Sequence, residues 1–239
     1  MKLVRKRISD PHLLGLIESW LESGVMEDGR FLASNGLGTP QGSVISPLLA
    51  NIYLHSFDKM FQQSGIPGLL VRYCDDFVVL LKRNGKTVLK RVKEMLSRLK
   101  LTLHPTKTRI VHVANGFDFL GMHFRLSPVK KKGSRLTHSC RLWPSNKSMK
   151  RIRERIRQVI GGRYSLSLEE IIKELNPMIR GWNNYHSVPA SQRKRLLVLN
   201  GFVFNRLRIF LKRKYNDQTR GLRRISGYQL FRLGLIRFG

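Results

Sequence analysis

The chain is poor in cysteine, in acidic residues and in long hydrophobic runs. Its two cysteines, Cys74 and Cys140, lie far apart in different sequence contexts, which indicates neither a disulfide framework nor a zinc site. No hydrophobic run is long enough to span a membrane and no amphipathic anchor stands out, so we expect no membrane partner. Residues 1–7 lack the apolar stretch of a secretory signal. Together these absences predict a protein of the reducing cytoplasm.

The shortage of acidic residues gives the chain a strong positive charge. Lysine and arginine number 45 against 15 aspartates and glutamates, for a formal net charge of +30. Residues 1–126 carry 18 basic and 10 acidic side chains, whereas residues 127–239 carry 27 and 5. This excess predicts nucleic acid as the partner, with most of the phosphate affinity in the second part. A hydrophobic content of 41% is enough to build a core in one or two domains.

Two adjacent aspartates, Asp75 and Asp76, interrupt the apolar stretch 69–81. β-Branched and aromatic residues on both sides predict a strand, a tight turn and a second strand, with the two carboxylates at the tip. Like charges in an apolar setting resist desolvation unless a cation offsets them. Magnesium, which binds one or two carboxylates together with substrate phosphates, is the natural partner. The alternative is a solvated turn, because aspartate is a common turn residue.

A loop rich in glycine and proline, residues 38–47, leads into an apolar stretch at 48–54. Ser46 is predicted to cap a helix there, with Pro47 at its first position. Gly42 permits the close approach of another backbone or of a nucleic-acid strand, and Gln41 beside it offers both a donor and an acceptor.

This loop and helix, followed by Tyr73-Cys74-Asp75-Asp76, form a long ordered run that resembles the palm of reverse transcriptases encoded by group II introns. These enzymes commonly carry alanine at the position of Cys74, and a small thiol should fit the same space. The resemblance implies an α+β fold in which a partial polymerase palm, an antiparallel sheet with helices on one face, precedes a helical thumb or maturase bundle. It places the palm at 1–126, a basic linker at 127–147 and the maturase domain at 148–239.

The resemblance also implies roles for individual residues. Asp75 and Asp76 would bind Mg²⁺ and carry the chemistry, while Lys107 would act near the incoming triphosphate, with an ordinary surface lysine as the alternative. The other implied contacts are nucleotide and template binding by Pro40, Gln41, Gly42 and Tyr73, and a grip on the primer end by Leu120 and Gly121. The implied ligands are a DNA primer, an RNA template and deoxynucleoside triphosphates.

The second half of the chain follows a helical pattern. One apolar stripe recurs at helical spacing from Met149 to Ile160, and basic side chains cover the remaining faces. Residues 179–186, Ile-Arg-Gly-Trp-Asn-Asn-Tyr-His, resemble the maturase domain that helps intron RNA to fold for splicing. The predicted RNA-binding residues are Arg151, Arg153, Arg155, Arg157, Arg180, Asn183 and His186. Asn183 and His186 have the alternative of capping or bridging helices, and Trp182 and Tyr185 that of core packing.

Local signals set further expectations for the secondary structure. A helix should begin at Asp10-Pro11 and end by residue 24. Strands are expected at 108–113 and 117–126. Ser167 begins a capping-box pattern, and Asn176-Pro177 should open a separate helix. A long helix over roughly 191–215 should complete a three-helix bundle.

The resemblance leaves a gap at the start of the chain. Family members carry fingers and a palm strand with another catalytic aspartate, and two-metal transfer usually takes carboxylates from more than one strand. Asp10, at a helix cap, and Asp58, on a helix, are poor replacements. One hypothesis is a truncated reverse transcriptase and maturase of a group II intron, which works on group II intron RNA with an upstream fragment or as a homodimer. The other is a non-catalytic RNA-binding splicing cofactor with a vestigial polymerase site.

Overall fold

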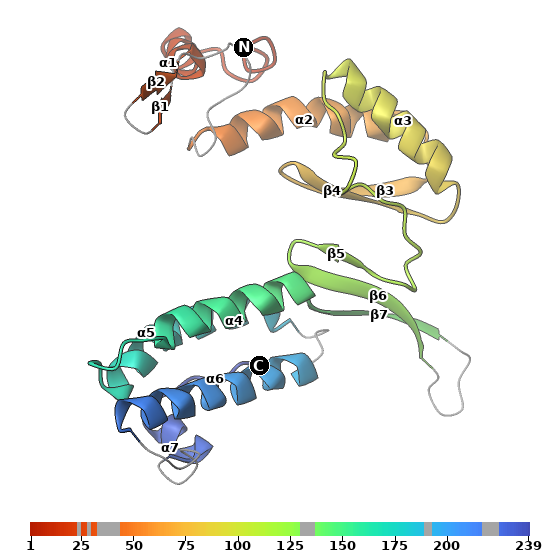
Figure 1. Ribbon diagram of the computed structural model, residues 1–239. Helices are drawn as coiled ribbons and strands as arrows, with labels where there is room; N and C mark the ends of the chain where they lie inside the picture. Colours follow the sequence, from red (N-terminus) through yellow and green to blue (C-terminus); the bar gives the residue numbers. More distant parts are fainter. Residues whose placement is uncertain (23–24, 28–29, 33–43, 130–136, 189–192, 217–224) are drawn as a thin grey trace. The chain divides into compact units, whose positions relative to one another are not determined.

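The computed structural model describes the chain except for residues 23–24, 28–29, 33–43, 130–136, 189–192 and 217–224. The chain forms two compact units, Met1–Ile110 and Val111–Gly239 (Figure 1). The predicted α+β class is confirmed, because small antiparallel sheets are combined with helices in both units.

The first unit begins with helix α1, Pro11–Glu22. The Asp10 carboxylate accepts hydrogen bonds from the backbone N–H groups of His12 at 2.8 Å and Leu13 at 3.1 Å, so the predicted N-cap is confirmed. Strands β1, Val25–Glu27, and β2, Arg30–Leu32, pair in an antiparallel manner after it.

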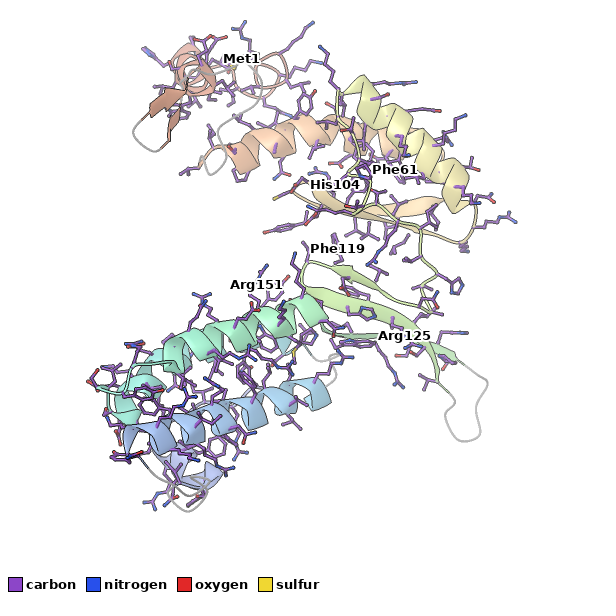
Figure 2. The ribbon with its side chains drawn as sticks, in the orientation of Figure 1. Met1, Phe61, His104, Phe119, Arg125 and Arg151 are labelled. Atoms are coloured by element: carbon purple, nitrogen blue, oxygen red, sulfur yellow. The ribbon has the colours of Figure 1, made fainter. Side chains whose placement is uncertain are left out.

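Two helices and one hairpin make the core of the first unit. Helix α2 spans Ser46–Gln63, strands β3 and β4 span Gly68–Tyr73 and Asp76–Leu81, and helix α3 spans Gly85–Arg98. Figure 1 shows α2 and α3 on the same face of the hairpin. The buried cluster between them consists of Phe57, Phe61, Ile66, Val88, Val92, Met95 and Leu96. Figure 2 labels Phe61, whose ring belongs to this cluster.

Two expectations for this part of the chain were wrong. Ser46 does not cap α2, because the helix already includes it and the N-cap is Ile45, which has no side-chain acceptor. Residues 108–113 form no strand. Their β-branched residues favour extended backbone, but a strand also needs a partner, and the only backbone bond between Val113 and β6 is the one that Leu126 donates, at 3.1 Å.

The second unit opens with a three-stranded antiparallel sheet. Its strands are β5, Phe117–Phe119, β6, Met122–Val129, and β7, Thr137–Pro144, in the order β5-β6-β7. The stretch 117–126, expected as a strand-like run, is therefore a hairpin with a turn inside it. The expected linker 127–147 contains the end of β6, all of β7 and the start of α4. Residues 137–141 of β7 are exposed, which is why this stretch is polar, and β7 still pairs with β6, as in Phe124 with Leu142.

After the sheet, the described residues form the helices α4, Asn146–Ile160, α5, Leu168–His186, α6, Arg193–Lys214, and α7, Gly227–Arg232. The predicted stripe of α4 is buried, and the capping box at Ser167 is confirmed by reciprocal bonds with Glu170. A separate helix opening at Asn176 was wrong, since α5 runs through Pro177 without a break. Buried Leu175 and Ile179 flank the proline and continue one apolar face, so packing outweighs the lost backbone bond.

Three asparagines bind the last residues of the chain to the helices. Each uses its amide N–H as a donor and its amide oxygen as an acceptor toward backbone groups of residues 234–239. Asn176 contacts Gly234 and Ile236, Asn183 contacts Arg237 and Gly239, and Asn200 contacts both backbone groups of Phe238. The side chain of Phe238 is buried in the same core.

Candidate active site and nucleic-acid interface

The β3–β4 hairpin carries the two aspartates at its tip, as the sequence predicted. Tyr73 pairs with Asp76, and Cys74 and Asp75 form the two-residue turn between them. Cys74 adopts a left-handed conformation with φ of 51°, which side chains other than glycine rarely take. Both aspartates are exposed, and neither forms an ion pair within the described residues.

The two faces of this hairpin differ in what covers them. Phe77 and Val79 on one face pack against the core of α2 and α3. On the other face Leu69 and Tyr73 are exposed, at 60% and 63% of their surface. Because cross-strand partners share a face, Tyr73 and Asp76 lie side by side on the exposed one. An apolar surface therefore borders the second carboxylate.

Arg72 ties the tip of the hairpin to helix α2. Its Nε and Nη2 donate to the two carboxylate oxygens of Asp58 at 2.8 and 2.5 Å. Its Nη1 donates to the Asn51 side-chain oxygen at 2.9 Å and to the Cys74 carbonyl at 2.8 Å. The hydrogen bond with Asp58 raises the pKa of Arg72, and partial burial opposes that shift. One guanidinium thus fixes both the helix and the turn residue that precedes Asp75.

This arrangement bears directly on metal binding. Asp58 is engaged by Arg72, so it is not available as a third carboxylate. Arg72 in turn is occupied by Asp58, so it does not neutralise Asp75 or Asp76. Among the described residues, no group of three or more histidine, cysteine or acidic side chains is placed to hold a metal ion. The two free carboxylates fit a cation that also takes oxygen ligands from a substrate.

For the remaining residues of the first unit predicted for the polymerase site, the structure shows no hydrogen bond or ion pair with the two aspartates among the described residues. Lys107 is exposed and lies in a turn of the first unit. It shares no hydrogen bond or ion pair with either aspartate, all three being described residues. Pro40, Gln41 and Gly42 lie outside the described residues.

Leu120 and Gly121, predicted to grip the primer, form the turn between β5 and β6 in the second unit. Both have positive φ angles, 48° and 75°. The start of α4 and the end of α5 donate hydrogen bonds to the backbone of this turn.

The four arginines of α4 predicted to bind RNA fall into two groups. Arg151 and Arg155 are exposed and make no ion pair within the described residues, and Figure 2 shows Arg151 on this helix. Arg153 and Arg157 lie over the ring of Phe202 on α6, at 5.8 and 5.3 Å from its centre. The second pair therefore stabilises helix packing through cation–π contact, whatever else it binds.

The three RNA-binding residues predicted on α5 also differ from one another. Arg180 is exposed. The amide of Asn183 is occupied by the backbone of Arg237 and Gly239. His186 is only 5% exposed, and burial lowers its pKa to about 4, so its ring is neutral at physiological pH. The burial of His186 argues against the RNA contact that the sequence predicted for it.

Comparisons with known families agree with the two halves of the chain. The family described as "Reverse transcriptase (RNA-dependent DNA polymerase)" matches residues 4–124. The family described as "Group II intron, maturase-specific domain" matches residues 149–226. The chain therefore belongs to the reverse transcriptase family and carries the maturase domain of group II intron proteins.

Individual relatives are longer than this chain. Protein YkfC of Escherichia coli K12 is 33% identical over 157 residues, which cover 51% of this chain and 41% of YkfC. An uncharacterised 91 kDa protein in the cob intron of Schizosaccharomyces pombe is 25% identical, over 77% of this chain and 32% of its own length. The group II intron-encoded protein LtrA of Lactococcus lactis is 26% identical, over 55% of this chain and 33% of LtrA. The chain thus spans about a third to two fifths of the length of these relatives.

The sequence reasoning missed several of the residues that organise these sites. Arg72 and Asn51 were not singled out, and Asp58 was considered only as a metal ligand. One signal was available, because Asn51 and Asp58 are two helical turns apart and lie on one side of α2.

Within the described residues, no helix is both long and apolar enough to cross a membrane.

Proposed function

We propose that this chain is part of an RNA-directed DNA polymerase that also serves as the maturase of a group II intron. The observation that carries the proposal is the pair of unneutralised carboxylates, Asp75 and Asp76, on a turn fixed by Arg72. Membership of the reverse transcriptase family supports it. The proposed substrates are a DNA primer, an RNA template and deoxynucleoside triphosphates.

In this proposal Asp75 and Asp76 hold Mg²⁺, as reverse transcriptases generally use divalent metal ions. When bound, magnesium supplies activation of the attacking hydroxyl and neutralisation of charge on the leaving pyrophosphate. Tyr73, exposed beside Asp76, offers a flat apolar surface to the nucleotide or template. Lys107 supplies a cation for the triphosphate, and Pro40, Gln41 and Gly42, which lie outside the described residues, bind the nucleotide or the template.

Primer extension tests the polymerase function. The assay uses an annealed primer–template, magnesium and deoxynucleotides, with the chain alone and with the upstream part of a longer relative supplied in trans. Asp75→Asn should abolish extension in whichever arm shows it and leave affinity for an RNA hairpin unchanged, because only a metal ligand is lost. Glu94→Gln, which neutralises an exposed carboxylate of the same unit, is the matched control. Full extension by Asp75→Asn would refute the assignment.

A splicing cofactor without polymerase activity is the second candidate. It is favoured because, among the described residues, no third acidic, histidine or cysteine side chain is placed to hold a metal ion together with the two carboxylates. Intact RNA binding with no extension in either arm of the assay would support this candidate over the polymerase.

For the RNA partner, we propose that group II intron RNA binds exposed basic residues of the second unit, chiefly Arg151, Arg155 and Arg180. Each phosphate contact releases counterions, so the logarithm of the binding constant falls by about 0.7–0.9 per contact for each tenfold rise in salt concentration. We call this dependence the salt slope. Replacing Arg151 and Arg155 together by alanine should lower the salt slope by about 1.4–1.8. The charge-matched control replaces exposed Lys173 and Lys212. An equal effect in the control would mean that total charge, and not this face of α4, sets the affinity.

A further inference from the structure

The turn between β5 and β6 has an unusual residue at its first position. Phe119 and Met122 close the hairpin, and Leu120 and Gly121 form the two-residue turn. Both turn residues have positive φ, 48° and 75°, which is the pattern of a type I′ turn. Glycine takes this conformation freely, whereas leucine takes it rarely. Such a residue persists only where its surroundings determine it, so neighbouring groups must hold Leu120 in place.

The helical bundle supplies these neighbours. The Tyr185 hydroxyl, near the end of α5, donates to the Leu120 carbonyl at 2.6 Å. The Gly121 carbonyl accepts from the Ser148 hydroxyl at 2.8 Å and from the Ser145 backbone N–H at 2.9 Å. Both carbonyls of the turn are therefore bound by the helices, one by α5 and the other by the start of α4.

Side chains of the bundle pack closely against Gly121. A Cβ atom on Gly121 would lie 2.9 Å from Ser148 Oγ, 3.8 Å from His186 Cε1 and 4.0 Å from Tyr185 Cε1. The buried His186 ring has its Nδ1 3.0 Å from the Met122 sulfur, in the residue that follows the turn. The end of α5 therefore contacts both the turn, through Tyr185, and the residue that follows it, through His186.

Aromatic rings at the end of α5 pack around His186 and support its contact with Met122. Trp182 packs on His186 with ring centres 4.1 Å apart, and Tyr185 meets the same imidazole edge-on at 4.8 Å. Because His186 is neutral and buried, it brings no charge to the turn. His186, a candidate for RNA contact, is thus packed against the residue that follows the turn.

We infer that Tyr185 and His186 are positioning residues, which fix the Leu120–Gly121 turn to the helical bundle so that the primer's 3′ end meets a preset backbone surface. This inference deepens the proposed polymerase function, since it takes the turn to be the part that contacts the primer. The ligand class is the sugar–phosphate backbone of a recessed primer end. The turn and the RNA-binding helices then act as one body.

Removing one hydroxyl separates this role from an RNA contact. Tyr185→Phe keeps the ring, and with it any stacking surface for a base, but it cannot donate to the Leu120 carbonyl. Tyr228→Phe removes a hydroxyl from an exposed tyrosine of the same unit and is the matched control. The full chain is titrated with three probes, namely a duplex with a recessed primer 3′ end, a blunt duplex of equal length, and an RNA hairpin.

We expect the wild-type chain to prefer the recessed end and Tyr185→Phe to lose about fivefold of that preference, as for one hydrogen bond. Hairpin affinity should stay within about twofold, and Tyr228→Phe should match the wild type on all three probes. Ser148→Ala removes the independent bond to Gly121 and should lower the same preference, which keeps the test decisive if Tyr185→Phe folds poorly.

Two results would overturn the inference. The first is an unchanged preference in both variants, and the second is an equal loss on the duplex and hairpin probes, which would indicate a direct RNA contact or general loosening of the bundle. A wild-type chain without any preference for the recessed end would instead contradict the proposed polymerase function, before any variant is considered.

Discussion

Arg72→Lys tests whether one guanidinium fixes the tip of the aspartate hairpin. The planar fork of arginine binds both oxygens of Asp58 and still reaches Asn51 and the Cys74 carbonyl. A lysine ammonium is a point charge on a flexible stem, so it cannot make the bidentate contact and reach the turn together. We expect lysine to keep part of the attraction to Asp58 and to release the turn that carries Asp75.

The size of the effect follows from the burial of the pair. The side chains of Arg72 and Asp58 are 12% and 32% exposed, so the pair lies between surface and core. Exposed pairs contribute about 0.2–1 kcal/mol, whereas breaking a buried pair costs about 3–5 kcal/mol. We therefore expect Arg72→Lys to lower the local stability of the hairpin by about 2 kcal/mol, a factor of roughly 30 in the opening equilibrium. Arg72→Met leaves the carboxylate unpaired and should cost about 3 kcal/mol.

Amide hydrogen exchange read by mass spectrometry measures this loss in the full chain, because peptides from 68–81 report on the hairpin alone. Their exchange should become roughly 30-fold faster in Arg72→Lys, while peptides from α4 to α6 keep the wild-type rate. Arg98→Lys, an exposed position on α3, is the control. Hairpin exchange within threefold of wild type would refute the reasoning, as would equal acceleration in the bundle.

Two further predictions concern the second unit. Asn200→Ala removes both hydrogen bonds to Phe238 and should destabilise the bundle by roughly 2–3 kcal/mol in urea unfolding, whereas Asn205→Ala on the exposed side of α6 should change it by less than about 0.5 kcal/mol. The pKa of His186 is lowered to about 4 in the folded chain, so the unfolded chain binds an extra proton between about pH 6.5 and 4. The melting temperature of the bundle should therefore be highest above pH 6.5 and fall toward pH 4, and His186→Gln should weaken this dependence.

Elements set by nearby residues were predictable from the sequence. The cap at Asp10, the aspartate hairpin, the buried stripe of α4 and the capping box at Ser167 each depend on signals within a few residues. Their energetics are local, so periodicity and turn chemistry are sufficient to locate them.

The errors arose where a distant partner overrides a local signal. Asn176-Pro177 has the form of a helix start, yet Asn176 binds the backbone of Gly234 and Ile236, 58 and 60 residues away, and α5 continues through the proline. Residues 108–113 have strand composition, but among the described residues their backbone bonding to β6 stops at the one hydrogen bond that Leu126 donates to Val113. No pattern within a short window contains either fact, because both depend on which segments meet in the folded unit.

The positive charge of residues 127–239 predicts a nucleic-acid partner, but it does not predict which basic residues bind it. Composition fixes the sign of the partner's charge, but it cannot tell which cations face solvent. Arg163 is paired with Glu174, Arg195 lies over Trp143, Arg237 lies over Phe231 at 3.7 Å, and Lys214 donates to the Leu166 carbonyl. Cations already engaged with the protein add little to counterion release on binding. The salt slope for RNA should therefore correspond to far fewer phosphate contacts than the 27 basic residues of this half would allow.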